Sequence, residues 1–346
     1  MRPSSLFSGY FIRKEDTMKK ILVIGAALFL IIGMCAFAGG GKAASGGGAQ
    51  QETVKEIRVA TGGTAGTYYP YGTAIGQIWQ EQVKIPVTIQ STGASRANLQ
   101  LIDAGEIEVA MVQNDTADYG FKGIDMFAAE GAIKTFTAMA SLYPEQCQIV
   151  ARANAGIRTI ADLKGKRVSV GDVGSGTEIC ALQILESYGI GPNDIQKQNL
   201  GFGASAEAIK NGQLDAAFNV AGAPTAAIVD LALTNDIIIL EVDTAGANKL
   251  KQKYPFYATV SIPANTYKGQ NAAVQVVAIK AIFVVANTMP ENVVYDLTKI
   301  LIEKQPQIAA AHAKGKELSR ASIADGISIP FHPGAAKYLK EIGAIK

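Results

Sequence analysis

The stretch of sequence that decides the fold is IRVATGGTAGTYYPYG, residues 57–72. Its apolar beginning, residues 57–61, predicts a short strand. Three glycines interleaved with three threonines then lead into a predicted helix. A glycine backbone lets a ligand approach closely, and the free N–H groups at the start of a helix favour an anion such as a carboxylate. The sequence therefore predicts that this loop forms one wall of a ligand site.

Strand-like and helix-like patterns alternate in this part of the chain. The strand-like runs are 57–61, 87–91 and 109–113, the helix-like patterns between them are 74–82 and 97–104, and polar loops follow the strands at 62–68, 92–98 and 114–118. Such alternation predicts parallel strands joined by crossover helices, with a ligand crevice at the carboxyl ends of the strands. We expect the three polar loops to converge on that edge.

A second unit repeats this order in the middle of the chain. It contains a short helix at 160–164, a strand at 167–170, the loop GDVGSGT at 171–177, a following helix, and strands at 216–220 and 237–242. Long apolar strands at 136–151 and 274–285 are expected to join the two units, and helices at 291–311 and 335–342 to cover the first. The pattern predicts an α/β fold of two lobes around a cleft, with lobe 1 at 56–142, lobe 2 at 143–273 and a return to lobe 1 at 274–346.

The N-terminal region has the order of a secretory signal. Lys19 and Lys20 precede an apolar run at 21–34, and small residues follow it, so that cleavage is expected after Ala38. The run is shorter than the ~20 apolar residues that a membrane span needs. We therefore expect an exported protein in the periplasm.

Cys35 offers an alternative to cleavage, because a cysteine that closes an apolar run is also a candidate acylation site of a lipoprotein. Met18 is the expected start of translation, since a signal needs no polar segment before its basic residues. Residues 1–38 are thus assigned to an N-terminal extension and signal peptide, and residues 39–55 to a flexible leader, of which residues 39–51 have no apolar content to bury.

The composition of the exported chain argues against several classes of protein. After Ala38, 308 residues remain, with 27 basic and 28 acidic side chains. A net charge near −1 argues against a nucleic-acid-binding surface, so we expect no nucleic acid partner. The two remaining cysteines, Cys147 and Cys180, are too few for a disulfide scaffold. They either pair with each other or, as we expect, are two small buried thiols.

Motifs for catalysis and metal binding are missing from the sequence. Only two histidines are present, His312 and His332, and neither adjoins a serine for which it would act as the base. Two histidines do not supply the three or four ligands of a zinc site. Residues 201–206 match a dinucleotide fingerprint only weakly, and there is no GxxxxGK[ST] loop. We expect no enzymatic activity and no cofactor.

Several motifs in the chain resemble those of a known family. They are GGTAGTYYPYG at 62–72, QND at 113–115, YPE at 143–145, DLKGKRVSVGDVGSGT at 162–177, GQLDAAF at 212–218 and HPGAAKY at 332–338. In their order and spacing, the chain after residue 55 resembles the TAXI-type solute receptors of tripartite ATP-independent periplasmic (TRAP) transporters. Ser95-Arg96 departs from the pattern, because the family usually has a less bulky or acidic residue there.

The resemblance implies a type II periplasmic-binding-protein fold with a ligand cleft between its lobes. It also implies capture of a small organic acid or amino acid, with glutamate expected, and delivery to TRAP membrane permease subunits. We expect the receptor to be a monomer. The alternative is a solute-sensing lipoprotein of the same fold that acts with a signalling partner.

The expected ligand-binding residues lie in the loops at the strand ends of both lobes. They are Gly63, Thr64, Gly66, Thr67, Tyr68, Ser91, Thr92, Ser95, Asn98, Gln113, Asp115, Glu145, Ser175, Gly176 and Thr177. The backbone and hydroxyl groups of the first loop are expected to hold a carboxylate, with Tyr68 packing on the ligand. Residues 175–177 are expected to grip the ligand from the second lobe.

Some of these residues also have a structural interpretation. Ser175 suits a helix N-cap, Asp115 either binds a ligand ammonium or caps a helix, and Asn98 either contacts the solute or ties loops together. Glu145 either faces the cleft or pairs with Arg152, and we favour the cleft.

Overall fold

A computed structural model describes residues 54–346. The predictions on the signal, on Cys35 and on the leader up to residue 53 lie outside the described residues. The strands are β1 (Ile57–Ala60), β2 (Val87–Gln90), β3 (Val109–Gln113), β4 (Phe136–Arg152), β5 (Arg167–Ser169), β6 (Gln196–Gln198), β7 (Ala216–Ala221), β8 (Ile237–Leu240), β9 (Ala258–Ile262) and β10 (Val274–Ala286).

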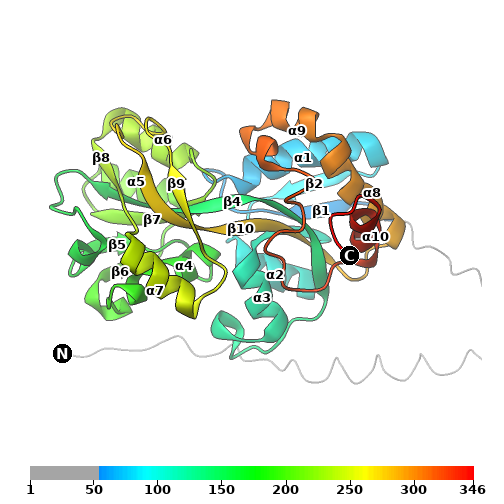
Figure 1. Ribbon diagram of the computed structural model, residues 1–346, viewed down its shortest axis with the longest axis horizontal. Coiled ribbons are helices and arrows are strands. Elements are labelled where there is room, and N and C mark those ends of the chain that lie inside the picture. Colours follow the sequence, from blue (N-terminus) through cyan, green and yellow to red (C-terminus); the bar gives the residue numbers. More distant parts are fainter. Residues whose placement is uncertain (1–53) are drawn as a thin grey trace, which may run out of the picture. The chain divides into compact units, whose positions relative to one another are not determined.

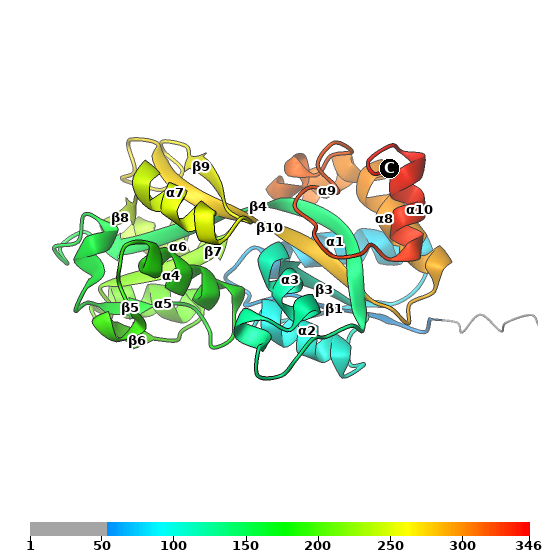
Figure 2. The same ribbon diagram turned by 60° about the horizontal axis from the view of Figure 1, so that its bottom comes forward.

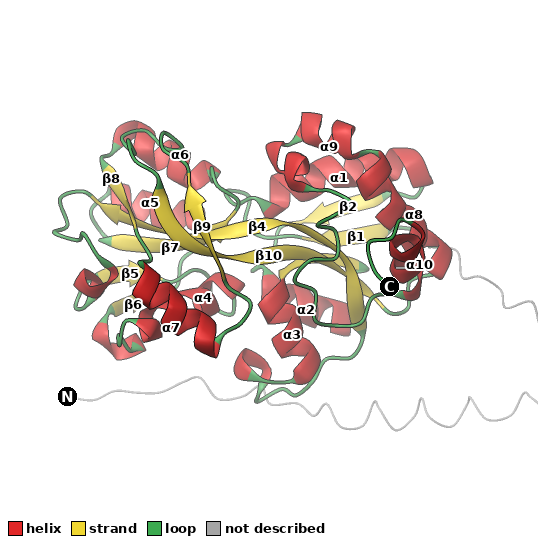
Figure 3. Cartoon of the chain, viewed as in Figure 1, coloured by secondary structure: helices red, strands yellow, loops and turns green. Residues whose placement is uncertain are grey.

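Helices follow most of the strands, as Figure 3 shows. The α-helices are α1 (Tyr68–Val83), α2 (Ser95–Asp103), α3 (Asn114–Lys122), α4 (Gly176–Ser187), α5 (Phe202–Lys210), α6 (Ala226–Thr234), α7 (Thr244–Lys253), α8 (Glu291–Glu303), α9 (Gln305–Ala311) and α10 (Pro333–Glu341). Short 3-10 helices are η1 (Asp125–Phe127), η2 (Ile160–Leu163), η3 (Pro192–Asp194) and η4 (Ala313–Glu317).

The strands of residues 54–346 form one mixed sheet. Their order is β2-β1-β3-β10-β4-β7-β5-β6, while β8 also pairs with β4 and β9 with β10. β1 is parallel to β2 and β3, and β5 is parallel to β6 and β7. The long strands β4 and β10 run antiparallel to each other and pass through both parallel groups (Figure 1). The fold is therefore α/β with two lobes, as predicted.

The first lobe has one apolar core, built from buried residues in the ranges 57–143 and 281–339. α1 and α9 lie on one side of its sheet, and α2 and α3 lie on the other (Figure 1). Trp79 of α1 is fully buried, its ring centroid 5.0 Å from that of Phe283 on β10. Its indole Nε1 donates to the carbonyl of Leu297 on α8 at 3.0 Å. The C-terminal helices therefore complete the first lobe.

The second lobe has an apolar cluster on each face of its sheet. Because strand side chains alternate between faces, Ile149 and Phe218 join the cluster covered by α4 and α7. Their neighbours Val150 and Ala217 join the cluster covered by α5 and α6. Figure 2 shows the two pairs of helices around the strands of this lobe.

β4 and β10 connect the two lobes side by side. β10 pairs with β3 of the first lobe at residues 281–285, whereas β4 pairs with β7 of the second lobe at residues 146–151. Between these two regions, Glu145 lies opposite Ile279 and Pro144 lies opposite Lys280. Glu145 thus lies where the chain passes from one lobe to the other.

The predicted loop at 114–118 is wrong, because α3 begins directly after β3 at Asn114. The Asn114 side chain accepts from the Lys280 amide at 3.0 Å and donates to the Gly326 carbonyl at 2.8 Å. These partners are 166 and 212 residues away in sequence, so no local pattern reveals them.

The single helix predicted at 291–311 is also wrong, because α8 ends before Lys304 and α9 begins at Gln305. Pro306 lies in the first turn of α9, where a proline is tolerated. In the interior of one continuous helix it would remove a backbone hydrogen bond, so α8 does not continue through it.

The two cysteines of the described region, Cys147 and Cys180, are both buried and free, as expected. None of the helices within residues 54–346 combines the length and the apolar character that crossing a membrane requires.

Candidate ligand-binding site

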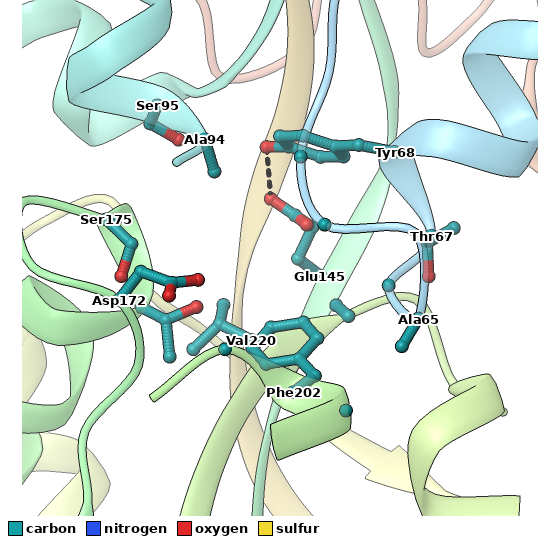
Figure 4. A pocket seen from close by; sticks show the side chains of 18 of the residues that line it. Ala65, Thr67, Tyr68, Ala94, Ser95, Glu145, Asp172, Ser175, Phe202 and Val220 are labelled. Carbon is teal, nitrogen blue, oxygen red and sulfur yellow. Dashed lines mark hydrogen bonds between the residues drawn. The ribbon is translucent and has the colours of Figure 1, made fainter. Parts of the chain in front are cut away.

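A cavity of about 200 Å³ lies between the two lobes (Figure 4). This volume is below the roughly 300–1,000 Å³ of pockets for drug-sized ligands, and it suits a small metabolite. The lining residues are Gly62, Gly63, Thr64, Ala65, Gly66, Thr67, Tyr68, Ala94, Ser95, Gln113, Glu145, Asp172, Ser175, Gly176, Thr177, Gly201, Phe202, Gly203, Ala204, Val220 and Ala221.

The β1–α1 loop forms the wall of the first lobe. It is tightened by a hydrogen bond from the Gly66 amide to the Gly63 carbonyl at 3.0 Å. A Cβ on Gly66 would lie 3.3 Å from the ring of Phe202, which belongs to the second lobe. Thr67 Oγ1 donates to the carbonyl of Gly222 across the cleft at 3.2 Å. This wall is therefore in contact with the opposite lobe.

The β5–α4 loop forms the facing wall. Gly171 and Gly174 have φ angles of 96° and 73°, which favour glycine. Ser175 caps α4, because its side chain accepts from the Glu178 amide at 3.1 Å. A Cβ on Gly176 would lie 1.8 Å from Gln113 Oε1, so a side chain at this position would have to displace the Gln113 side chain of the opposite lobe.

Four helices begin at the cavity: α1, α2, α4 and α5. The amides of Gly176 and Thr177, the first two residues of α4, donate to no acceptor within residues 54–346. Free amides and the positive end of the helix dipole both stabilise an anion. The cavity can therefore bind a carboxylate through backbone groups alone.

Among residues 54–346, no lysine or arginine lines the cavity, and the two acidic lining residues are Glu145 and Asp172. Glu145 is fully enclosed and accepts from the Tyr68 hydroxyl at 2.8 Å (Figure 4). Burial raises the pKa of Glu145 to about 8 and the pKa of Tyr68 well above its usual range. The Glu145 carboxyl is therefore mostly protonated at neutral pH. Arg152, its alternative partner, pairs instead with Asp215 at 3.0 Å.

Eleven of the predicted residues line the cavity. They are Gly63, Thr64, Gly66, Thr67, Tyr68, Ser95, Gln113, Glu145, Ser175, Gly176 and Thr177. They come from separate strand ends of both lobes, so the structure brings together the loops that the sequence singled out. Their contact with a ligand stays a prediction.

Three other predicted residues, Ser91, Thr92 and Asn98, lie behind the lining. Ser91 and Thr92 donate to the carbonyls of Gly62 and Thr61 at 3.0 and 2.9 Å. The side-chain amide of Asn98 donates to the carbonyls of Thr61 and Met111, both at 2.7 Å. These side chains hold the loops in place.

Thr92 also supports the start of α2, because its hydroxyl accepts from the Ala94 amide at 3.1 Å. Ala94 lines the cavity with a φ angle of 67°, a conformation that favours glycine. Such strain is maintained only where the surrounding contacts impose it.

Asp115 also lies outside the lining. It is fully buried, and its carboxylate accepts from the Thr116 amide at 2.6 Å. The thiol of Cys180 lies 3.9 Å from Asp115 and 3.7 Å from the side chain of Gln113. Burial raises the pKa of Asp115 to about 7. The structure therefore does not place Asp115 where a ligand ammonium in the cavity would contact it.

Several lining residues, notably Asp172 and Phe202, are absent from the predicted set. Phe202 begins α5, directly after the loop that follows β6. In the sequence, this segment matches only a weak dinucleotide fingerprint. Its glycine loop precedes a helix, as in the other walls, but β6 has no apolar run that would indicate a strand before the loop.

The histidines lie outside the cavity lining. His312 and His332 cap η4 and α10, because their Nδ1 atoms accept from the amides of Lys314 and Gly334, each at 3.2 Å. Within residues 54–346, no group of three or more His, Cys, Asp or Glu side chains is arranged to hold a metal ion.

The chain is similar to several solved structures. PhnD1 from Prochlorococcus marinus in complex with methylphosphonate is 12% identical, with 84% of this chain and 98% of that chain covered and a TM-score of 0.50. A binding-protein component of an ABC phosphonate transporter from Pseudomonas aeruginosa is 12% identical, with 84% and 95% covered and a TM-score of 0.49. The aliphatic sulphonate binding protein SsuA from Escherichia coli is 16% identical, with 83% and 84% covered and a TM-score of 0.46.

At such low identity, these similarities concern the fold alone. A family model matches residues 59–343, which span both lobes and every wall of the cavity. The chain belongs to the NMT1-like family.

Proposed function

We propose that this protein is an exported solute receptor of the periplasm that captures a small carboxylate-bearing solute in the cavity between its lobes. The observation that carries the proposal is the convergence of four helix starts on one cavity, with free amides at Gly176 and Thr177. The likeness in fold to PhnD1, which was solved in complex with methylphosphonate, supports it. An amino acid such as glutamate is the proposed solute, and a TRAP membrane permease is the proposed recipient, because of the motif resemblance described above.

The lobes already contact each other around the cavity. Thr67 bonds to Gly222, and the Ala227 amide donates to the Ala65 carbonyl at 3.3 Å. A ligand therefore enters only after the lobes open, and bending of β4 and β10 near Glu145 supplies that motion. Closure would then bring both walls onto the solute and create a shape that a permease recognises.

A thermal-shift screen of amino acids and organic acids tests this function. A ligand that binds only the folded state raises the melting temperature, and at 100 times its Kd the expected rise is about 5 °C. We expect such a shift with L-glutamate or a related carboxylate. A screen in which no carboxylate raises the melting temperature would contradict the proposal.

Two glycine variants locate the binding site. Gly176→Val places a side chain against Gln113 and should abolish the ligand-induced shift. Gly191→Val, in the same lobe but away from the cavity, meets only Asp194 at 3.6 Å and should keep the shift. Equal ligand-induced shifts in both variants would exclude this cavity as the binding site.

A further inference from the structure

Asp172 is a carboxylate that lines the cavity. It lies in the β5–α4 loop and is half-buried, and it lies beside Ser175 in Figure 4. Its side chain accepts no hydrogen bond from residues 54–346. A Cβ built on Gly201, the residue before α5, would lie 3.0 Å from Asp172 Oδ2. The carboxylate therefore remains available to a ligand.

Two cations that lie beside the β5–α4 loop are already paired. Arg96, which packs against the neighbouring Gly174, pairs with Glu130. Lys197 pairs with Glu178 of α4 at 2.9 Å. A ligand that fills the cavity would remove water from Asp172, and an unpaired buried carboxylate is costly. A positive group on the ligand would offset this cost.

The other acids near the cavity do not meet this need. Glu145 already accepts the Tyr68 hydroxyl, and its pKa of about 8 leaves it mostly neutral at pH 7. Asp115 is outside the lining and accepts from Thr116. Asp172 is the lining residue that combines an open carboxylate with partial exposure.

We propose that Asp172 binds a positively charged amine of the ligand from the second lobe, and so selects amine-bearing carboxylates over plain dicarboxylates. The inference rests on the proposed receptor function. The ligand carboxylate would lie at the helix starts, and its ammonium would face Asp172. A dicarboxylate without an amine would leave Asp172 unpaired and would be repelled by it.

Calorimetric titration with matched pairs of ligands tests this role. The pairs are L-glutamate with glutarate, L-aspartate with succinate, and L-leucine with 4-methylpentanoate. The wild type should bind the amino member of its preferred pair about 100-fold more tightly than the member without the amine. Asp172→Asn should reduce this preference at least tenfold, because it removes the charge and keeps the shape.

Asp243→Asn is the matched control, because it removes one negative charge from the same lobe at the cap of α7, away from the cavity. It should leave the preference unchanged. A purely structural role of Asp172 at the start of α5 would weaken both members of a pair equally, which would overturn the inference.

Two results in the wild type separate this inference from the receptor function. Equal or tighter binding of the members without an amine would overturn the role of Asp172 while the receptor function stands. Binding of no member of the panel would overturn both.

Discussion

At the scale of single residues, two buried acids have raised pKa values, one in the cavity lining and one outside it. Glu145 has a pKa of about 8 and Asp115 a pKa of about 7, in both cases chiefly because burial disfavours the charged form. An unfolded chain releases these protons near pH 4. Between about pH 4 and pH 8 the folded state therefore binds more protons than the unfolded state, and its stability falls as the pH rises.

Glu145→Gln should remove the larger part of this pH dependence. Glutamine keeps an acceptor for the Tyr68 hydroxyl but cannot ionise. The free energy of unfolding of the wild type, relative to the variant, should decrease by on the order of 2–4 kcal/mol from pH 5 to pH 9. Urea unfolding of both proteins at several pH values measures it. Parallel curves for the two proteins would show that Glu145 is ionised at neutral pH in the folded state.

The sequence predicts the lining residues of the glycine and hydroxyl loops well, because these loops follow strands directly. It does not separate Ser95, which lines the cavity, from Ser91 and Thr92, whose hydroxyls bind backbone carbonyls. Both groups are small hydroxyl residues in polar loops. The sequence does not predict Asp172 as a binding residue, because that role depends on which cations lie near its carboxylate in the folded chain.

At the scale of elements, the start of α4 combines a structural cap with a cavity wall. Ser175→Ala removes the acceptor of the Glu178 amide and should lower the free energy of unfolding by about 1 kcal/mol. Since Ser175 also lines the cavity, we expect weaker ligand binding as well.

Asp243→Ala provides the comparison, because Asp243 caps α7 by accepting from Gly246 at 2.9 Å and lies outside the cavity lining. Asp243→Ala should lower the free energy of unfolding at least as much as Ser175→Ala does, because Asp243 also accepts from the Tyr188 hydroxyl. It should leave ligand binding intact. Urea unfolding and calorimetry of both variants check this. If Ser175→Ala changes stability alone, Ser175 is a cap and nothing more.

The strand positions follow closely from apolar runs, and β3 coincides with its predicted range of 109–113. Short or locally ambiguous elements do not follow from such patterns. β6 has three exposed polar residues, and it is a strand only because β5 pairs with it. The start of α3 likewise depends on the distant partners of Asn114.

At the scale of the whole molecule, the long strands β4 and β10 turn two α/β units into one continuous sheet. The sequence predicts both strands and their role as connections. It does not predict that they pair with each other along their length, because strand partners far apart in sequence leave no local signal. This pairing places Glu145 between the lobes and aligns the two walls of the cavity.

The central claim is that both lobes hold one small carboxylate ligand through the starts of their helices. A crystal structure of the exported chain with L-glutamate, or with the tightest ligand of the screen, tests it most directly. The account predicts ligand density in the cavity, with carboxylate oxygens within hydrogen-bond distance of the Gly176 and Thr177 amides. Density for the ligand at another site, with the cavity between residues 62–68 and 175–177 unfilled, would contradict it.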